Sequence, residues 1–295
     1  MRETMTSSAA PIRLAEELAT ATRTLERAGV CEARREAMHL WSALADLPSG
    51  RVWLERDQPI EADAVTSFRE SVRRRARGMP FAYATGRVAF RTLTLAVDPR
   101  ALIPRPETEG LVELVLRRMG PELGGIAADI GTGSGCIALS LAIEGRFERV
   151  VATERSEPAA ALARENVARV RPVTPVDVRV GDLLQPLAGE RCRVIAANPP
   201  YLTNAEWAVL DPAVREFEPL PALVSGVDGL AATRRLLHGA QDVLAPGGVL
   251  ALEVDERRAT AVASLARAAG WSGVTMHRDL FGRPRYAVAV AGGNV

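Results

Sequence analysis

The stretch ADIGTGSGCIALSLA, residues 128–142, shapes the interpretation of the whole chain. Gly131, Gly133 and Gly135 stand between a short apolar strand and an apolar helix, where glycines let the backbone turn tightly and approach a ligand closely. The spacing is GxGxG, and a dinucleotide fingerprint would need its third glycine where Cys136 stands. A P-loop needs a lysine, and the sequence has none. The loop alone is weak evidence for a ligand site, because a tight turn would show the same glycines.

Strands and helices alternate after residue 125. We expect strands over 126–131, 149–154, 176–182, 192–198 and 247–254, and helices over 134–145, 157–170 and 232–245. Short apolar strands alternating with helices predict a parallel sheet covered on both faces. Residues 273–292 offer two more strands with no helix between them, so the last strand should run antiparallel.

The first part of the chain has a different pattern. Helical periodicity predicts helices over 11–29, 31–46 and 62–78. Residues 83–98 alternate and are rich in β-branched side chains, which predicts a short hairpin between two domains. A further helix should begin just after the prolines within residues 101–119.

Composition limits the function classes. The chain has 295 residues, 47% of them hydrophobic, and a net charge of +1. With so little net charge, the protein as a whole has no electrostatic attraction to nucleic acid or to an anionic membrane. Cys31, Cys136 and Cys192 lie far apart, which argues against a disulfide framework or a zinc site, and we expect no metal. No apolar run reaches about 18 residues. We predict a cytoplasmic protein that does not enter membranes.

Two carboxylates strengthen the case for a ligand at the glycine loop. Glu154 ends the second strand, where an acid can accept both hydroxyls of a ribose. Asp182 ends the third strand and could accept an exocyclic amine of adenine. Either residue alone would be interpreted as a solvent-facing strand end. Together with the glycines at three successive strand ends, they indicate one shared crevice, and this pattern resembles the class I S-adenosylmethionine-dependent methyltransferases.

The sequence CRVIAANPPYL, residues 192–202, predicts a second site beside that crevice. Two prolines end a buried strand, and Pro200 has no N–H with which to continue a ladder. The side-chain oxygen of Asn198 and the carbonyl of Pro199 would then be two fixed acceptors for a planar NH2 group. Tyr201 offers a flat face for stacking. The alternative is that these residues only form a rigid loop exit.

An NPPY element of this kind is shared by methyltransferases that act on adenine N6 and by those that act on protein glutamine. The rest of the chain, from about residue 12 to 291, resembles the peptide chain release factor N5-glutamine methyltransferases, the PrmC/HemK type. The resemblance is carried by RRRARGMPFAYATGRVAF (73–90), LIPRPETE (102–109), DIGTGSGCIALSLA (129–142), GDLLQPL (181–187), NPPYL (198–202), FEPLPALVSGVDGL (217–230) and DLFGRPRYAVA (279–289).

The resemblance implies a fold, a cofactor and a partner. It implies a class I Rossmann-like catalytic domain over 105–295, a helical substrate-recognition domain over 1–79 and a hairpin linker over 80–104. S-adenosyl-L-methionine would contact Asp129, Gly131, Thr132, Gly133, Ser134, Gly135, Glu154, Asp182, Leu183 and Asn198. Asn198, Pro199, Pro200 and Tyr201 would hold the glutamine of the GGQ motif in class 1 release factors. We expect a monomer that binds no nucleic acid directly.

The chain departs from the family pattern at a few positions. Glu154 stands where the family usually has Asp, and Leu183 where an aromatic residue is frequent. Asp255 and Arg258 replace the commoner Gly and Gln, which affects the local turn and partner contacts. Two other functions stay open from the residues alone: adenine N6 methylation of DNA or RNA, and a non-enzymatic cofactor sensor or ribosome-associated binding protein.

Overall fold

The computed structural model describes residues 12–121 and 124–292, which form two compact units that divide between Gly86 and Arg87. The first residues of the predicted helical domain (1–11) and the last of the predicted catalytic domain (293–295) lie outside the described residues. Within the described ranges, no helix is both long and apolar enough to cross a membrane. The predicted domain boundaries at residues 79 and 104, on either side of the hairpin linker, stay a proposal.

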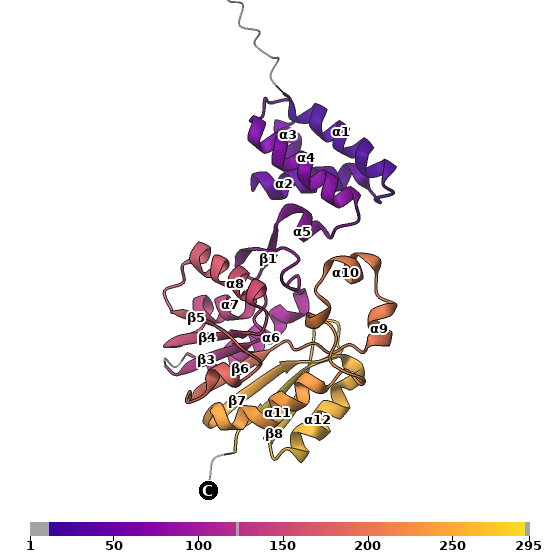
Figure 1. The fold of residues 1–295 in the computed structure, drawn as a ribbon. Coiled ribbons are helices and arrows are strands. Elements are labelled where there is room, and N and C mark those ends of the chain that lie inside the picture. Colours follow the sequence, from indigo (N-terminus) through magenta and orange to yellow (C-terminus); the bar gives the residue numbers. More distant parts are fainter. Residues whose placement is uncertain (1–11, 122–123, 293–295) are drawn as a thin grey trace, which may run out of the picture. The chain divides into compact units, whose positions relative to one another are not determined.

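The first unit is helical (Figure 1). Its helices are α1 (Leu14–Arg27), α2 (Ala33–Ala45), α3 (Ser49–Glu55), α4 (Ala62–Ala76) and α5 (Phe81–Thr85). Leu25 and Leu40 are buried in its core. The Trp41 and Phe68 rings pack edge to face there, with 5.2 Å between their centroids. Three of these helices were predicted from periodicity. Helices α3 and α5 were not predicted, because seven and five residues are too few to show a helical period.

The second unit begins with the predicted hairpin. Its strands are β1 (Arg87–Phe90) and β2 (Leu93–Ala96), which pair antiparallel. The hairpin starts later than predicted, because α5 occupies residues 81–85 and ends at Gly86, whose φ is +72°. Phe90 and Leu95 are buried in the same core as Leu111 of the helix α6 (Pro106–Met119). The hairpin therefore packs as part of the second unit.

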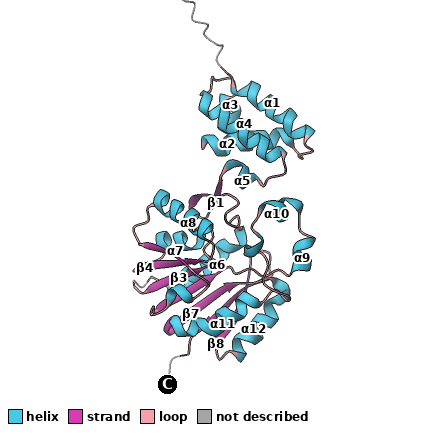
Figure 2. Cartoon of the chain, viewed as in Figure 1, coloured by secondary structure: helices cyan, strands magenta, loops and turns pink. Residues whose placement is uncertain are grey.

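A sheet of seven strands forms the body of this unit (Figure 2). Its strands are β3 (Ile126–Ile130), β4 (Arg149–Glu154), β5 (Val176–Val180), β6 (Cys192–Ala197), β7 (Leu244–Glu253), β8 (Ser272–Arg278) and β9 (Pro284–Val290). They are ordered β5-β4-β3-β6-β7-β9-β8. Only β9 runs against its neighbours, β7 and β8, so the predicted mostly parallel sheet with an antiparallel last strand is confirmed.

Helices cover both faces of the sheet (Figure 1). On one face lie α6, α7 (Cys136–Glu144) and α8 (Glu157–Val170), and on the other α11 (Ala231–Val243) and α12 (Ala259–Ala268). Two short helices that the sequence analysis did not predict, α9 (Asn204–Ala208) and α10 (Pro212–Phe217), follow the NPPY element. The central strands β3, β4 and β6 are mostly apolar because they are buried between these helices, whereas no residue of the edge strands β5 and β8 is buried.

The first turn of α6 is held close to the carboxyl ends of the strands. A Cβ on Gly110 would lie 2.1 Å from the Tyr286 hydroxyl oxygen, so only glycine lets α6 approach β9 this closely. The same hydroxyl donates a hydrogen bond of 2.7 Å to the Glu107 carbonyl. The residues that follow the prolines of LIPRPETE are thereby fixed near the carboxyl ends of the strands.

Candidate active site

A cavity of about 340 Å³ lies at the carboxyl ends of β3, β4, β5 and β6. The sequence-predicted residues that line it are Gly131, Gly133, Glu154, Asp182, Leu183, Asn198, Pro199 and Pro200. The other predicted residues are all described by the structure and lie outside this lining: Asp129, Thr132, Ser134, Gly135 and Tyr201. The topology thus brings together strand ends that are far apart in the sequence.

The glycine loop takes a backbone path that other residues rarely adopt. Gly131 has a φ of +72° and Gly133 a φ of +54°, both in the left-handed region. A Cβ on Gly131 would meet no atom within 4 Å, so its backbone angle and not crowding requires glycine there. The loop is also tied to β4, because the Gly131 N–H donates to the Thr153 carbonyl at 2.8 Å.

Asp129 supports this loop from behind. Its side chain is fully buried, and one carboxylate oxygen accepts hydrogen bonds from the Thr132 hydroxyl at 2.6 Å and the Ala138 N–H at 3.0 Å. Burial raises the pKa of Asp129 to about 7. Asp129 and Thr132 therefore link the end of β3 to the first turn of α7. Ser134 is also buried, and its carbonyl accepts from the Asn166 amide at 2.9 Å.

Each acidic residue of the cavity is already oriented by a neighbour. Glu154 accepts the Gly133 N–H at 3.0 Å on one oxygen and the Ser156 N–H at 2.9 Å on the other. Asp182 accepts from the Arg235 guanidinium at 2.7 Å. A carboxylate oxygen has two lone pairs, so both groups keep acceptor capacity for hydroxyl or amine donors. Arg235 is a cavity-lining residue that the sequence analysis missed.

The backbone at Leu183 has an unusual conformation. Its φ is +51°, in the left-handed region that a branched side chain rarely adopts. The Leu183 carbonyl accepts from the Thr153 hydroxyl at 2.9 Å, which holds the residue in place beside the cavity. Backbone strain of this kind persists only where surrounding contacts hold the residue in place.

Asn198 directly follows β6, and its side-chain NH2 group is hydrogen-bonded. The Asn198 Nδ2 donates to the Thr108 hydroxyl at 3.0 Å. The side-chain oxygen of Asn198 is therefore the end of the amide left to accept a donor at the cavity. The chain beyond the two prolines is fixed as well, because the Leu202 N–H donates to the Leu223 carbonyl at 2.9 Å and the Ser225 N–H donates to the Leu202 carbonyl at 2.8 Å.

Tyr201 has a perturbed hydroxyl. Burial raises the pKa of Tyr201 to about 12, and the nearby Glu253 carboxylate acts in the same direction. The hydroxyl therefore stays protonated at physiological pH and cannot act as a base.

Two segments that the sequence analysis quoted without assigning a role form part of the cavity wall. Ala101 and Leu102 line it from one side, and Pro219 and Pro221 from the other. They are joined by Glu218, whose buried carboxylate accepts from Arg105 at 2.5 Å and from the Ile103 N–H at 3.3 Å. These partners are more than a hundred residues apart, so no local pattern could reveal the pair.

The unusual Asp255 and Arg258 have structural partners. Asp255 accepts the Arg257 N–H at 2.8 Å and caps the short turn Glu256–Arg258. Arg258 donates to the Asp228 carbonyl at 2.8 Å and to the Glu206 carboxylate at 2.6 Å. Together they tie α9 and the loop before α11 to the end of β7.

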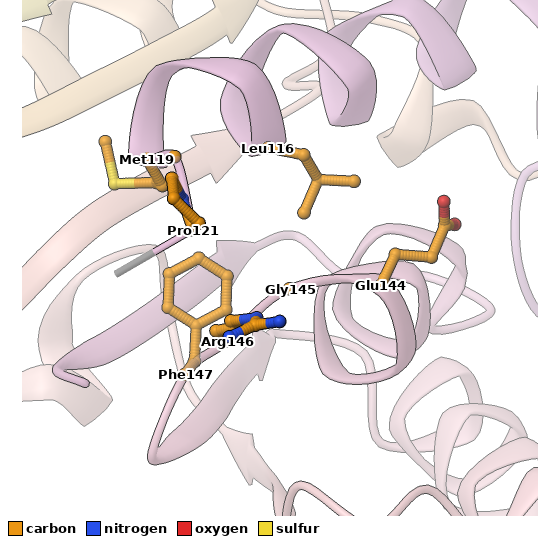
Figure 3. Close-up of a pocket in the computed structure, with 8 residues that line it drawn as sticks. Leu116, Met119, Pro121, Glu144, Gly145, Arg146 and Phe147 are labelled. Atoms are coloured by element: carbon orange, nitrogen blue, oxygen red, sulfur yellow. The ribbon is translucent and has the colours of Figure 1, made fainter. Parts of the chain in front are cut away.

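A second hollow, of about 140 Å³, lies at the opposite end of the strands, and Figure 3 shows residues that line it. It is formed where α6 and α7 end, by residues that include Leu116, Met119 and Phe147. Glu144 is engaged by Arg91, with 2.6 Å between carboxylate oxygen and guanidinium nitrogen. Nothing predicted for the site lies here, and we assign it no role in catalysis.

Comparison with known proteins agrees with this layout. Residues 16–86 match the family described as PrmC N-terminal domain, and residues 110–216 match the family described as Methyltransferase small domain. The structure of a T. thermophilus 16S rRNA N2 G1207 methyltransferase, in complex with AdoMet and guanosine, has a TM-score of 0.51 at 17% identity, over 70% of this chain and 50% of that chain. This likeness supports the class I methyltransferase fold.

Two curated relatives are similar over nearly the whole chain. The release factor glutamine methyltransferase of Moorella thermoacetica is 41% identical over 257 residues, 87% of this chain and 90% of the relative. That of Xylella fastidiosa (strain Temecula1) is 41% identical over 277 residues, 92% of this chain and 95% of the relative. The chain therefore belongs to the release factor glutamine methyltransferase family.

Proposed function

We propose that this protein transfers a methyl group from S-adenosyl-L-methionine to the side-chain amide nitrogen (N5) of the glutamine in the GGQ motif of class 1 release factors. The cavity suits that cofactor. Gly131 and Gly133 allow close approach, the Glu154 carboxylate can accept ribose hydroxyls, and Asp182 can accept the adenine amine. When bound, the cofactor supplies an electrophilic methyl group on a positively charged sulfur.

The observation that carries the proposal is the orientation of the Asn198 amide. Because its NH2 group is used by Thr108, its oxygen is the acceptor at the cavity. The carbonyl of Pro199 is a second acceptor, since Pro200 has no N–H to continue a strand. Two acceptors match the two N–H donors of a glutamine side-chain amide. The Tyr201 ring is the flat surface proposed to stack on that amide.

These acceptors would make a poor nucleophile reactive. An amide lone pair is delocalised into its carbonyl, so the nitrogen must be held with that pair directed at the methyl carbon. Positioning of this kind can be worth ~7–11 kcal/mol. The two oxygens also stabilise the positive charge that develops on the nitrogen as it bonds to carbon. The amide nitrogen bonds to the methyl carbon, whose bond to sulfur breaks with the electron pair left on sulfur. The nitrogen then releases one proton to solvent, so no strong base is needed.

We propose the helical unit as the part that recognises the body of the release factor. Its surface has a hollow of about 590 Å³ beside the half-exposed Trp53, whose ring lies 3.7 Å from the Arg56 guanidinium. An exposed aromatic ring beside arginines is the composition that favours protein binding. We propose further that the protein acts as a monomer in the cytoplasm, without binding nucleic acid directly.

The proposal is tested by offering labelled cofactor to the purified full-length protein with four acceptors. These are a folded class 1 release factor, the same factor with its GGQ glutamine changed to alanine, duplex DNA and ribosomal RNA. We expect label only on the unaltered factor. Label on DNA or RNA adenine, with an unlabelled factor, would replace the proposal with adenine N6 methylation. Absence of label on every acceptor would favour a binding protein.

A further inference from the structure

Three polar side chains from distant parts of the chain form a linear hydrogen-bonded series at the end of the sheet. Glu253 ends β7, Thr108 lies in the first turn of α6, and Asn198 follows β6. The Thr108 hydroxyl donates to the Glu253 carboxylate at 2.7 Å, and the Asn198 NH2 donates to the Thr108 oxygen at 3.0 Å. The side chains of Glu253 and Thr108 are buried, with residue exposures of 1% and 2%.

The direction of every bond in this series follows from the carboxylate. An ionised carboxylate can only accept, so the Thr108 hydroxyl must spend its single proton on Glu253. The Thr108 oxygen can then only accept from Asn198, which leaves the NH2 end of that amide turned inward. The two ends of an asparagine amide have nearly the same shape, so the hydrogen-bond partner decides which end faces the cavity.

We propose that Thr108 and Glu253 are positioning residues that hold the oxygen of the Asn198 amide toward the methyl-accepting nitrogen. This inference rests on the proposed transfer to a glutamine amide. With the Asn198 amide reversed, its NH2 would face the NH2 of the substrate, and two donors cannot bond to each other. Reversal would also take the Thr108 proton away from the buried Glu253 carboxylate, which would lose its donor.

The charge of Glu253 depends on all the groups around it. Arg285 on β9 and Arg105 before α6 favour the ionised form, and Glu107 opposes it. The Tyr201 and Tyr286 hydroxyls and the Cys136 thiol also lie close enough to be affected by the carboxylate. Burial outweighs these effects and raises the pKa of Glu253 to about 7. A protonated Glu253 can donate to Thr108, and the Asn198 amide would no longer be locked.

The test compares full-length variants in the release factor assay across pH. Thr108→Val removes the hydroxyl while keeping the shape, and we expect kcat to fall by up to about 100-fold, with cofactor affinity unchanged. Thr108→Ser should restore most of the loss. In the unaltered protein kcat should rise as pH passes about 7, where Glu253 ionises. Glu253→Gln should lack that rise, because an amide does not titrate.

A matched control is Thr233→Val, which removes a buried threonine hydroxyl on α11. It should leave both kcat and the pH profile unchanged. The inference would be overturned if Thr108→Val and Thr108→Ser were equally impaired, if Thr108→Val kept full activity, or if Glu253→Gln kept the rise near pH 7. Cofactor binding by each variant checks that it is folded. Failure of the unaltered protein to methylate any release factor would instead reject the proposed function.

Discussion

Asn198 is the residue on which the proposed chemistry depends most. Its amide oxygen and the Pro199 carbonyl are the only groups proposed to bond to both protons of the target nitrogen. Replacing Asn198 with alanine should lower kcat about 10²–10³-fold, which is typical of losing one preorganised polar group that stabilises developing charge. Cofactor affinity, measured by calorimetry, should fall only modestly. An equal loss in cofactor binding would show that Asn198 acts mainly in cofactor recognition.

Tyr201 is expected to act through its ring. Because burial raises the pKa of its hydroxyl to about 12, the hydroxyl cannot act as a base. Tyr201→Phe should therefore keep activity within a few-fold, whereas Tyr201→Ala should lose the stacking surface, worth roughly 0.5–1.5 kcal/mol beyond its area. Steady-state kinetics on the folded release factor distinguish the two. Similar losses in both variants would assign the function to the hydroxyl.

At the scale of elements, the Arg105–Glu218 pair holds two walls of the cavity together. Glu218→Ala removes a buried carboxylate together with the acceptor of the Ile103 N–H, and should cost about 1–3 kcal/mol of unfolding free energy. Because those walls line the cavity, cofactor affinity should fall as well. Both quantities can be measured by urea unfolding and calorimetry.

The control for this variant is Glu157→Ala, which removes an exposed ion pair with Arg164 on α8. An exposed pair of this kind contributes about 0–1 kcal/mol. Cofactor affinity in Glu157→Ala should be unchanged. If Glu218→Ala behaved like this control, the pair would have no part in shaping the cavity.

Local sequence patterns predicted most of the helices and strands, but few of the contacts between them. The alternation of strands and helices is written in neighbouring residues, so the parallel sheet and the strand-end positions of Glu154, Asp182 and Asn198 could be predicted. The short helices α9 and α10 have too few residues to show a period. Thr108 and Glu253 are 145 residues apart, so their contact with each other depends on the sheet order. That Asp129 and Thr132 contact the cofactor stays a prediction, and the structure shows that their side chains are hydrogen-bonded to each other.

At the scale of the whole molecule, buried acids make stability depend on pH. Burial raises the pKa of Asp129 from an ordinary 3.8 to about 7. At pH values between these two, the folded protein binds more protons than the unfolded chain. The contribution of Asp129 to stability is therefore full at low pH and is lost as the pH rises toward 7. Glu253 acts in the same direction.

Asp129→Asn should remove the Asp129 part of this dependence. The free energy of unfolding, measured in urea from about pH 5 to 8, should fall less steeply in the variant than in the unaltered protein. Asp228→Asn is the control, because a hydrogen bond from Arg234 lowers the pKa of Asp228 to about 2, outside that range. An unchanged slope in Asp129→Asn would mean that Asp129 is ionised throughout.

The helical unit is proposed to recognise the folded substrate. Trp53→Ala should therefore raise KM for the release factor about tenfold, the loss of roughly 1.4 kcal/mol typical of an interface aromatic residue. The kinetics of a short GGQ peptide should not change, because the peptide reaches only the methyl-transfer site. Val173→Ala, a fully exposed apolar position in the other unit, is the control. Equal effects on factor and peptide would contradict a recognition role.

The Asn198 and Pro199 oxygens are proposed to direct a methyl group to one amide nitrogen. The most direct measurement is tandem mass spectrometry of a class 1 release factor treated with the protein and S-adenosylmethionine carrying a deuterated methyl group. We expect one labelled methyl on the side-chain nitrogen of the GGQ glutamine, and labelling about 10²–10³-fold slower when Asn198→Ala replaces the unaltered protein. A label on any other residue, or full labelling by Asn198→Ala, would contradict this proposal.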